Sequence, residues 1–173
     1  PQPFPGAPAG LALSELDLAS LVNGEDKECQ RSSSWEGQLY VHGDVAYAPR
    51  RAYRSWNEAG QYRQKQTLTL YIIDLRDRKS PKLAGTLVVE QDSESNDGYL
   101  GGIVLTDHAL LVGRTEGRYY ASYDENGTFV PPTPKYSYDI YDLKDPLKPA
   151  FTKRFEVPSR IAGGGWGYGY GGC

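Results

Sequence analysis

Four aspartates stand in two pairs along the chain, and of its residues these are best suited by type and spacing to acid–base chemistry. Asp74 and Asp77 form the first pair, and Asp142 and Asp145 repeat the same spacing 68 positions later. Two carboxylates held close together can divide the roles of general acid and general base. Each pair, however, follows an apolar run and precedes a proline, where an aspartate accepts backbone N–H bonds from a turn. We therefore interpret all four as turn-forming residues rather than catalytic pairs.

Metal and nucleophile chemistry find little support in the remaining polar residues. Residues 92–98, Asp-Ser-Glu-Ser-Asn-Asp-Gly, alternate oxygen ligands as calcium loops do, but the glycine is one position late and Ile103 stands where a bidentate Glu is needed. His42 and His108 have no metal-ligand spacing, and no serine lies in a nucleophile-elbow motif. The sequence therefore predicts no catalytic residue, no metal and no cofactor.

Basic and aromatic residues interleave between positions 50 and 65, in a composition that resembles a surface for nucleic acid or an anionic glycan. The net charge of −3 does not favour a nucleic-acid protein. We interpret this stretch as a solvated hairpin and expect no nucleic-acid partner. Its members are Arg50, Arg51, Tyr53, Arg54, Trp56, Tyr62, Arg63 and Lys65.

The aspartate pairs belong to a longer internal repeat. Residues 70–77, Leu-Tyr-Ile-Ile-Asp-Leu-Arg-Asp, return at 138–145 as Tyr-Asp-Ile-Tyr-Asp-Leu-Lys-Asp, and a proline follows each copy at the same distance. Upstream, residues 39–50 match residues 103–114 at an offset of 64. Because the offset rises from 64 to 68, the later copy contains small insertions between the matching segments. A repeat of this length indicates one structural unit used twice.

Each unit is predicted to contain four strands joined by hairpins, as the alternation of Thr and Leu at 67–70 and the short Gly-containing turns indicate. Prolines at 131, 132 and 134 predict a break or bulge in the third strand of the second unit. The expected strands are about 38–42, 45–56, 61–75 and 83–90, then 102–106, 109–123, 128–143 and 151–157.

Four antiparallel strands per repeated unit favour an all-β fold of β-propeller blades, and a β-sandwich is the main alternative. The segment 72–77 with Ser80-Pro81, and the later Asp145-Pro146-Leu147-Lys148-Pro149, resemble the bacterial LVIVD-type repeat and secreted bacterial propellers with WD-like repeats. Arg78 departs from that pattern, because a proline is usual there. The resemblance implies an exported binding or scaffold protein and carries over no catalytic residue.

The expected organisation is a proline-rich linker at 1–13, a short helix with a connector at 14–36, one blade at 37–90 and a second at 91–158. Ser14 would cap the helix and Asn23-Gly24 would end it. Residues 159–173 would start a further blade or form a glycine and aromatic tail. Two blades cannot close a ring, so we expect further blades of the same polypeptide, other copies or a partner protein to complete it.

Two features near the ends of the chain could form links or interfaces. Cys29 and Cys173 could pair with each other in an exported protein, pair outside this segment, or remain free. In extended form, Trp166, Tyr168 and Tyr170 would share one face, as an interface strand or within a plain linker. No apolar run is long enough to cross a membrane.

The expected function is a non-catalytic binding or scaffold module of an exported bacterial protein in a cell-surface or periplasmic assembly. The location would be periplasmic, outer-surface or extracellular. Two alternatives remain open: a propeller that recognises carbohydrate or another ligand, and part of a propeller hydrolase whose catalytic residues lie elsewhere.

Overall fold

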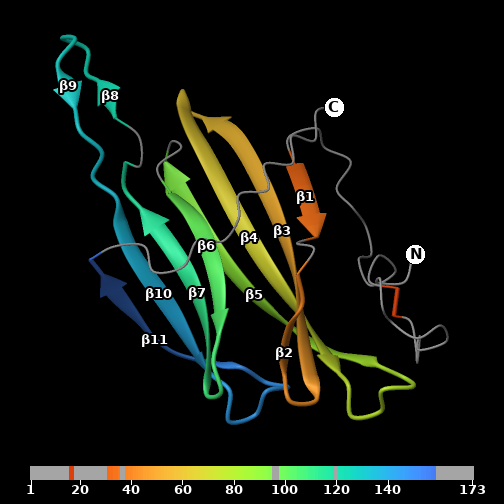
Figure 1. Ribbon diagram of the computed structural model, residues 1–173. Helices are drawn as coiled ribbons and strands as arrows, with labels where there is room; N and C mark the ends of the chain where they lie inside the picture. The colour runs from red at the N-terminus through yellow and green to blue at the C-terminus, as the bar shows by residue number, and fades with distance from the viewer. Residues whose placement is uncertain (1–15, 18–30, 36–37, 95–97, 119–120, 159–173) are drawn as a thin grey trace, which may run out of the picture.

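A computed structural model of the chain describes residues 16–17, 31–35, 38–94, 98–118 and 121–158. Within these ranges the chain is all-β, with eleven strands and no helix. The strands form two large antiparallel sheets and one small hairpin (Figure 1). The expectation of an all-β fold built from antiparallel four-stranded units is confirmed. The described residues do not form a closed ring.

The first sheet is built around three long neighbouring strands, β3 (Val45–Glu58), β4 (Gln61–Asp74) and β5 (Lys82–Glu94). Two short strands, β2 (Tyr40–His42) and β1 (Arg31–Trp35), both pair with the other edge of β3. β2, β3, β4 and β5 follow one another in space as they do in sequence.

The turns of this sheet adopt the backbone that tight hairpins require. Ala59 and Gly60, between β3 and β4, both have positive φ angles, of 50° and 80°. Two consecutive positive φ angles give a two-residue turn the twist that matches its flanking strands. Gly43, between β2 and β3, also has a positive φ of 57°. Chain reversal therefore depends on these few positions.

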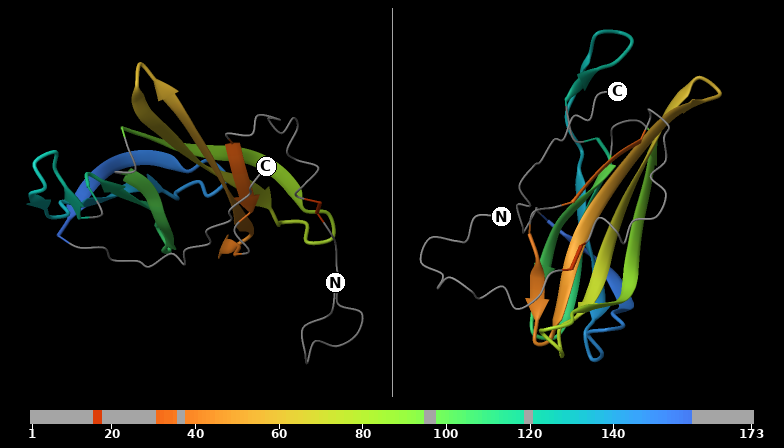
Figure 2. Two further views of the ribbon diagram at one scale, coloured as in Figure 1. Left: turned by 90° about the horizontal axis from the view of Figure 1, so that it is seen from above. Right: turned by 90° about the vertical axis from the view of Figure 1, so that its right-hand side faces the viewer.

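The second sheet repeats the arrangement with β6 (Gly98–Leu105), β7 (Ala109–Glu116), β10 (Lys135–Asp142) and β11 (Ala150–Val157), in the order β11-β10-β7-β6. The predicted break at the prolines is confirmed. A separate hairpin, formed by β8 (Ser122–Tyr123) and β9 (Phe129–Val130), precedes them and extends beyond the end of the sheet (Figure 2).

The predicted N-terminal helix is not seen. Leu16 and Asp17 are not helical, and the rest of that segment up to residue 30 lies outside the described residues. Residues 31–35, expected as a connector, form β1 instead. β2 covers only the first three residues of β3, and β1 supplies partners for Arg50–Arg54 further along the same edge. Unpaired backbone groups at a strand edge favour such an addition.

Two local features recur at equivalent positions of the two sheets. The backbone N–H of Leu75 donates to the carbonyl of Asp44 at 2.7 Å, and that of Leu143 donates to His108 at 3.0 Å. A strand irregularity lies between residues 72 and 73 in the first sheet and between 140 and 141 in the second. Both features lie at positions separated by the sequence offsets of 64 and 68.

Candidate functional site

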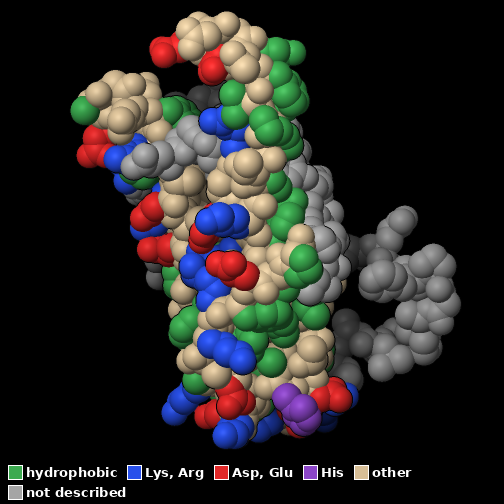
Figure 3. Space-filling model, turned by 90° about the vertical axis from the view of Figure 1, so that its left-hand side faces the viewer, with side chains coloured by type: hydrophobic (Ala, Val, Ile, Leu, Met, Phe, Trp, Pro, Cys, Tyr) green, Lys and Arg blue, Asp and Glu red, His purple; other side chains and the backbone are tan. Residues whose placement is uncertain are grey.

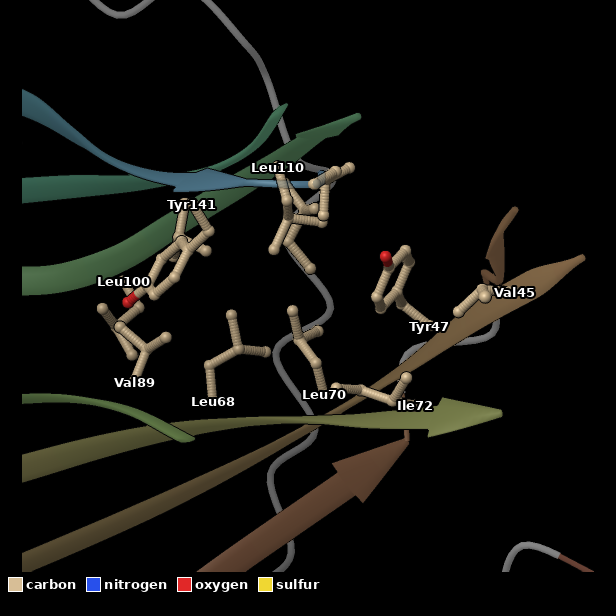
Figure 4. Close-up of a cluster of buried hydrophobic side chains, with 12 residues drawn as sticks. Val45, Tyr47, Leu68, Leu70, Ile72, Val89, Leu100, Leu110 and Tyr141 are labelled. Carbon is tan, nitrogen blue, oxygen red and sulfur yellow. The ribbon is translucent and has the colours of Figure 1, made fainter. Parts of the chain in front are cut away.

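The two sheets pack face to face through apolar inner faces. Side chains from both sheets point toward one another in a single buried cluster (Figure 4). Leu68, Leu70, Leu110 and Val112 have no exposed surface at all. Burying a large aliphatic side chain contributes about 1.5–3 kcal/mol, so this shared cluster joins the sheets into one unit. Its members are Val45, Tyr47, Leu68, Leu70, Ile72, Val89, Leu100, Ile103, Leu110, Val112, Tyr141 and Leu143.

Hydrogen bonds to the backbone fix how the sheets sit on each other. The guanidinium of Arg51, on β3, donates to the carbonyls of Leu100 and Gly101 on β6, at 2.9 Å and 2.6 Å. The hydroxyl of Tyr47 donates to the carbonyl of Pro146 at 2.8 Å. Burial, together with the charge of Asp145, raises the pKa of Tyr47 to about 12.

Three glutamines of the first sheet continue this polar contact. The side-chain amides of Gln64 and Gln66 both donate to the carbonyl of Gly98, and that of Gln91 donates to Thr115. A Cβ at Gly98 would lie 2.7 Å from the amide nitrogen of Gln91. Because their amides bond to the facing backbone, these glutamines position the sheets.

A charged group lies on the inner face of the second sheet. The carboxylate of Asp139, whose side chain is 2% exposed, accepts from the Nε of Arg114 at 2.5 Å and from the Nε of Arg154 at 2.6 Å. Arg154 also lies 3.5 Å from Glu116. A buried charge is tolerated where partners of opposite sign surround it. No local sequence pattern marks these residues, because they come together only across neighbouring strands.

The outer face of the first sheet carries a small apolar cluster. Ala46, Ala48, Tyr71 and Ile73 are buried there, and Leu16 and Leu75 pack against them. Further apolar side chains on this face remain exposed: Val41 by 57%, Leu83 by 39% and Val88 by 51%. The outer face of the first sheet therefore presents several apolar side chains to solvent.

The outer face of the second sheet is also apolar. Tyr138 stacks on Phe155 with ring centroids 6.1 Å apart, and Phe155 is 37% exposed. The half-buried residues around them on this face are Val104, Leu111, Tyr136, Ile140 and Val157. Figure 3 shows the side of the molecule on which β10 and β11 lie, where hydrophobic side chains gather beside alternating basic and acidic ones. These two outer faces are the candidate functional surfaces.

The interleaved basic and aromatic residues do not form one surface. Strand alternation places Arg51, Tyr53 and Tyr62 on the inner side and the others on the outer side. Lys65 pairs with Glu90 at 2.8 Å, which raises the pKa of Lys65, and Arg63 lies 3.7 Å from Glu58. Three of the outer residues, Trp56, Arg63 and Lys65, line a hollow of about 510 Å³ together with Glu58, Gln64, Asp92 and Ser93.

The repeated aspartates form turns, as interpreted from the sequence. Asp74 and Asp142 each accept from the backbone N–H two positions later, at 3.0 Å and 2.9 Å. Asp77 and Asp145 do the same, at 3.0 Å and 3.1 Å. Hydrogen bonds from Arg76 lower the pKa of Asp74 to about 2. The side-chain oxygens of these four aspartates therefore stabilise the loop that follows the third strand of each unit.

The histidines lie in two equivalent turns on different sheets. The Nε2 of His42 lies 2.8 Å from the carbonyl oxygen of Asp107 in the turn that contains His108. Within the described ranges, no three His, Cys, Asp or Glu side chains come together as a metal would require. Nor does that part of the chain contain a helix with the length and hydrophobicity needed to cross a bilayer.

Several predicted site residues lie outside the described residues. These are Cys29 and Cys173, proposed as a disulfide, and Trp166, Tyr168 and Tyr170, proposed as an interface strand. The possible third blade at 159–173 also falls there. Of the acidic segment 92–98, the first three residues extend β5 and Gly98 begins β6, while 95–97 are not described.

Comparisons with protein-family models, with characterised proteins and with solved structures gave no match. Functional conclusions for this chain therefore rest on its own residues and geometry.

Proposed function

We propose that this chain is a non-catalytic binding or scaffold module of an exported bacterial protein, built from two β-propeller blades whose outer faces bind protein. The observation that carries the proposal is the pair of apolar outer faces. Val41 and Val88 on the first sheet are more than half exposed, and Phe155 on the second is 37% exposed. Contiguous apolar surface on a soluble protein marks an interaction site.

The arrangement of the sheets supports the propeller interpretation. Each unit is a four-stranded antiparallel meander, and the two units pack face to face. In a closed propeller every blade is covered on both faces by its neighbours. Here each sheet uses one face for the other sheet, which leaves the second face for a further blade or a partner protein.

The chemistry of the polar groups favours binding over catalysis. Asp74 and Asp142 serve turns, and Arg51 bonds to carbonyls of the facing sheet. A sugar site in the hollow beside Trp56 is less favoured. The guanidinium of Arg54 already lies over the indole ring on which a sugar would stack, 5.4 Å from the ring centre. The lysine and arginine that line the hollow have acidic neighbours within the same sheet.

Site-specific photo-cross-linking tests this proposal in the cells that produce the protein. A photoreactive amino acid at Val88 or Phe155 should form specific adducts with protein, because both positions lie on the outer faces. The control is Tyr123 in the β8–β9 hairpin, which is 73% exposed but lies on neither face. Absence of adducts at both face positions, or equal labelling at Tyr123, would contradict the proposal.

A further inference from the structure

We infer that the outer face of the second sheet binds the outer face of the first sheet in a second copy of this chain, in a head-to-tail contact. This inference rests on the proposed function, since it names the protein that the outer faces bind. It follows from whether equivalent residues of the two repeated units lie on the inner or on the outer face of their sheets.

The repeat shows that the contact within the chain joins two different faces of one unit. At the offset of 68, Leu70 and Ile72 correspond to Tyr138 and Ile140. The first two lie on the inner face of the first sheet, whereas their counterparts lie on the outer face of the second. On this outer face Tyr138 is 4% exposed and Ile140 is half-buried, whereas Phe155, the counterpart of Leu87, is 37% exposed. The face that packs on the other sheet in the first unit therefore points away from the other sheet in the second.

The other face of each unit shows the reverse arrangement: it is the inner face in the second sheet and the outer face in the first. Tyr141 lies on the inner face of the second sheet, and its counterpart Ile73 lies on the outer face of the first. At the offset of 64, Val41 corresponds to Leu105. Leu105 packs against the shared core, whereas Val41 is 57% exposed. Each open outer face is thus the counterpart of a face that the internal contact covers.

A contact between two different faces is heterologous, so each copy keeps one face free for the next copy. Such contacts generate a ring when the rotation closes and an open chain when it does not. The shared core shows that one contact of this kind forms stably within the chain. A second copy can therefore repeat it with the faces left open.

Sedimentation of the purified 173-residue chain tests the inference. The unmodified protein should form concentration-dependent assemblies. Phe155→Glu and Val41→Glu each place a charge on one outer face, and each should raise the dissociation constant about tenfold or more. The matched control is Phe129→Glu in the β8–β9 hairpin, at a side chain 57% exposed, and it should assemble as the unmodified protein does. Circular dichroism verifies that each variant folds.

Mixing the two variants separates head-to-tail contact from other self-association. Phe155→Glu retains an intact outer face on its first sheet, and Val41→Glu retains one on its second sheet. A mixture should therefore form a one-to-one dimer that neither variant forms alone. A monomeric unmodified chain, or a mixture that stays monomeric, would overturn the inference. Cross-linking of Phe155 to a different protein would overturn it as well, while leaving the proposed function intact.

Discussion

At the residue scale, the most consequential polar group is the carboxylate of Asp139. It lies between Arg114 and Arg154 on the inner face of the second sheet, and its side chain is 2% exposed. Removing one partner from a buried ionic group costs more than the pair itself contributes, because the remaining charge loses its compensation. Asp139 is therefore a charged residue on which the stability of the second sheet depends.

We expect Asp139→Asn to lower the free energy of unfolding by about 3–5 kcal/mol, because Arg114 would remain buried without a counter-charge. Urea denaturation followed by circular dichroism measures the change. Glu156→Gln, an exposed charge on β11, is the control and should change stability by about 0.5 kcal/mol or less. Equal stability of the Asn variant and the parent would show that Asp139 does not hold Arg114 in place.

The buried hydroxyl of Tyr47 makes stability depend on pH in the alkaline range. Its pKa rises from 10.0 to about 12 on folding, so above pH 10 the unfolded chain releases a proton that the folded chain retains. Stability should therefore fall as pH rises from 10 toward 12. Tyr47→Phe should remove this share of the pH dependence, while costing about 1 kcal/mol at neutral pH through the lost bond to Pro146. Urea titrations at several pH values measure both effects, and an unchanged alkaline slope in the variant would count against this role.

At the scale of the elements, the strands and turns follow local sequence signals closely. Aspartates, glycines and prolines place the reversals, and the proline-rich segment ends the β8–β9 hairpin before β10. β1 was missed because no local pattern in residues 31–35 distinguishes a strand from a connector. Its position depends on the long free edge of β3, which is distant in sequence.

Two glycines of the second unit allow the cost of a left-handed backbone to be distinguished from the cost of a steric clash. Gly117 and Gly127 have almost the same positive φ, 76° and 75°. A Cβ at Gly117 would lie 2.8 Å from the carbonyl oxygen of Thr133, whereas a Cβ at Gly127 would meet nothing within 4 Å. Gly127→Ala should cost about 1 kcal/mol from the left-handed backbone alone, and Gly117→Ala should cost clearly more. Thermal unfolding of the two variants measures the difference, and equal losses would show that Thr133 moves aside freely.

At the scale of the whole molecule, the shared core predicts that the sheets unfold together. Leu68 and Leu70 from the first sheet and Leu110 from the second are fully buried in one cluster. Neither sheet can lose the other without exposing that surface to water. The two repeats should therefore behave as one cooperative unit rather than as two independent domains.

A protein with Trp56 as its only tryptophan, made by Trp35→Phe and Trp166→Phe, reports on the first sheet. Leu110→Ala in the second sheet should lower stability by about 2–5 kcal/mol and shift the Trp56 fluorescence transition together with the circular dichroism transition. Leu39→Ala, at a residue 56% exposed, serves as the control and should shift neither. A Trp56 fluorescence transition that Leu110→Ala leaves unchanged would show that the sheets unfold separately.

The sequence by itself determined the duplicated unit, the order of its strands and the turns that end them, because these depend on local signals: alternation, aspartate and proline turns, and an offset of 68. Alternation shows that a strand has two faces but does not say which face meets the other sheet. That choice required the tertiary structure, as did the pairing of Arg114 and Arg154 with Asp139. The open faces of the repeated unit, Val41 on one sheet and Phe155 on the other, were likewise decided only when the sheets packed together. Contacts between residues distant in sequence depend on where folding places them, and no local pattern encodes them.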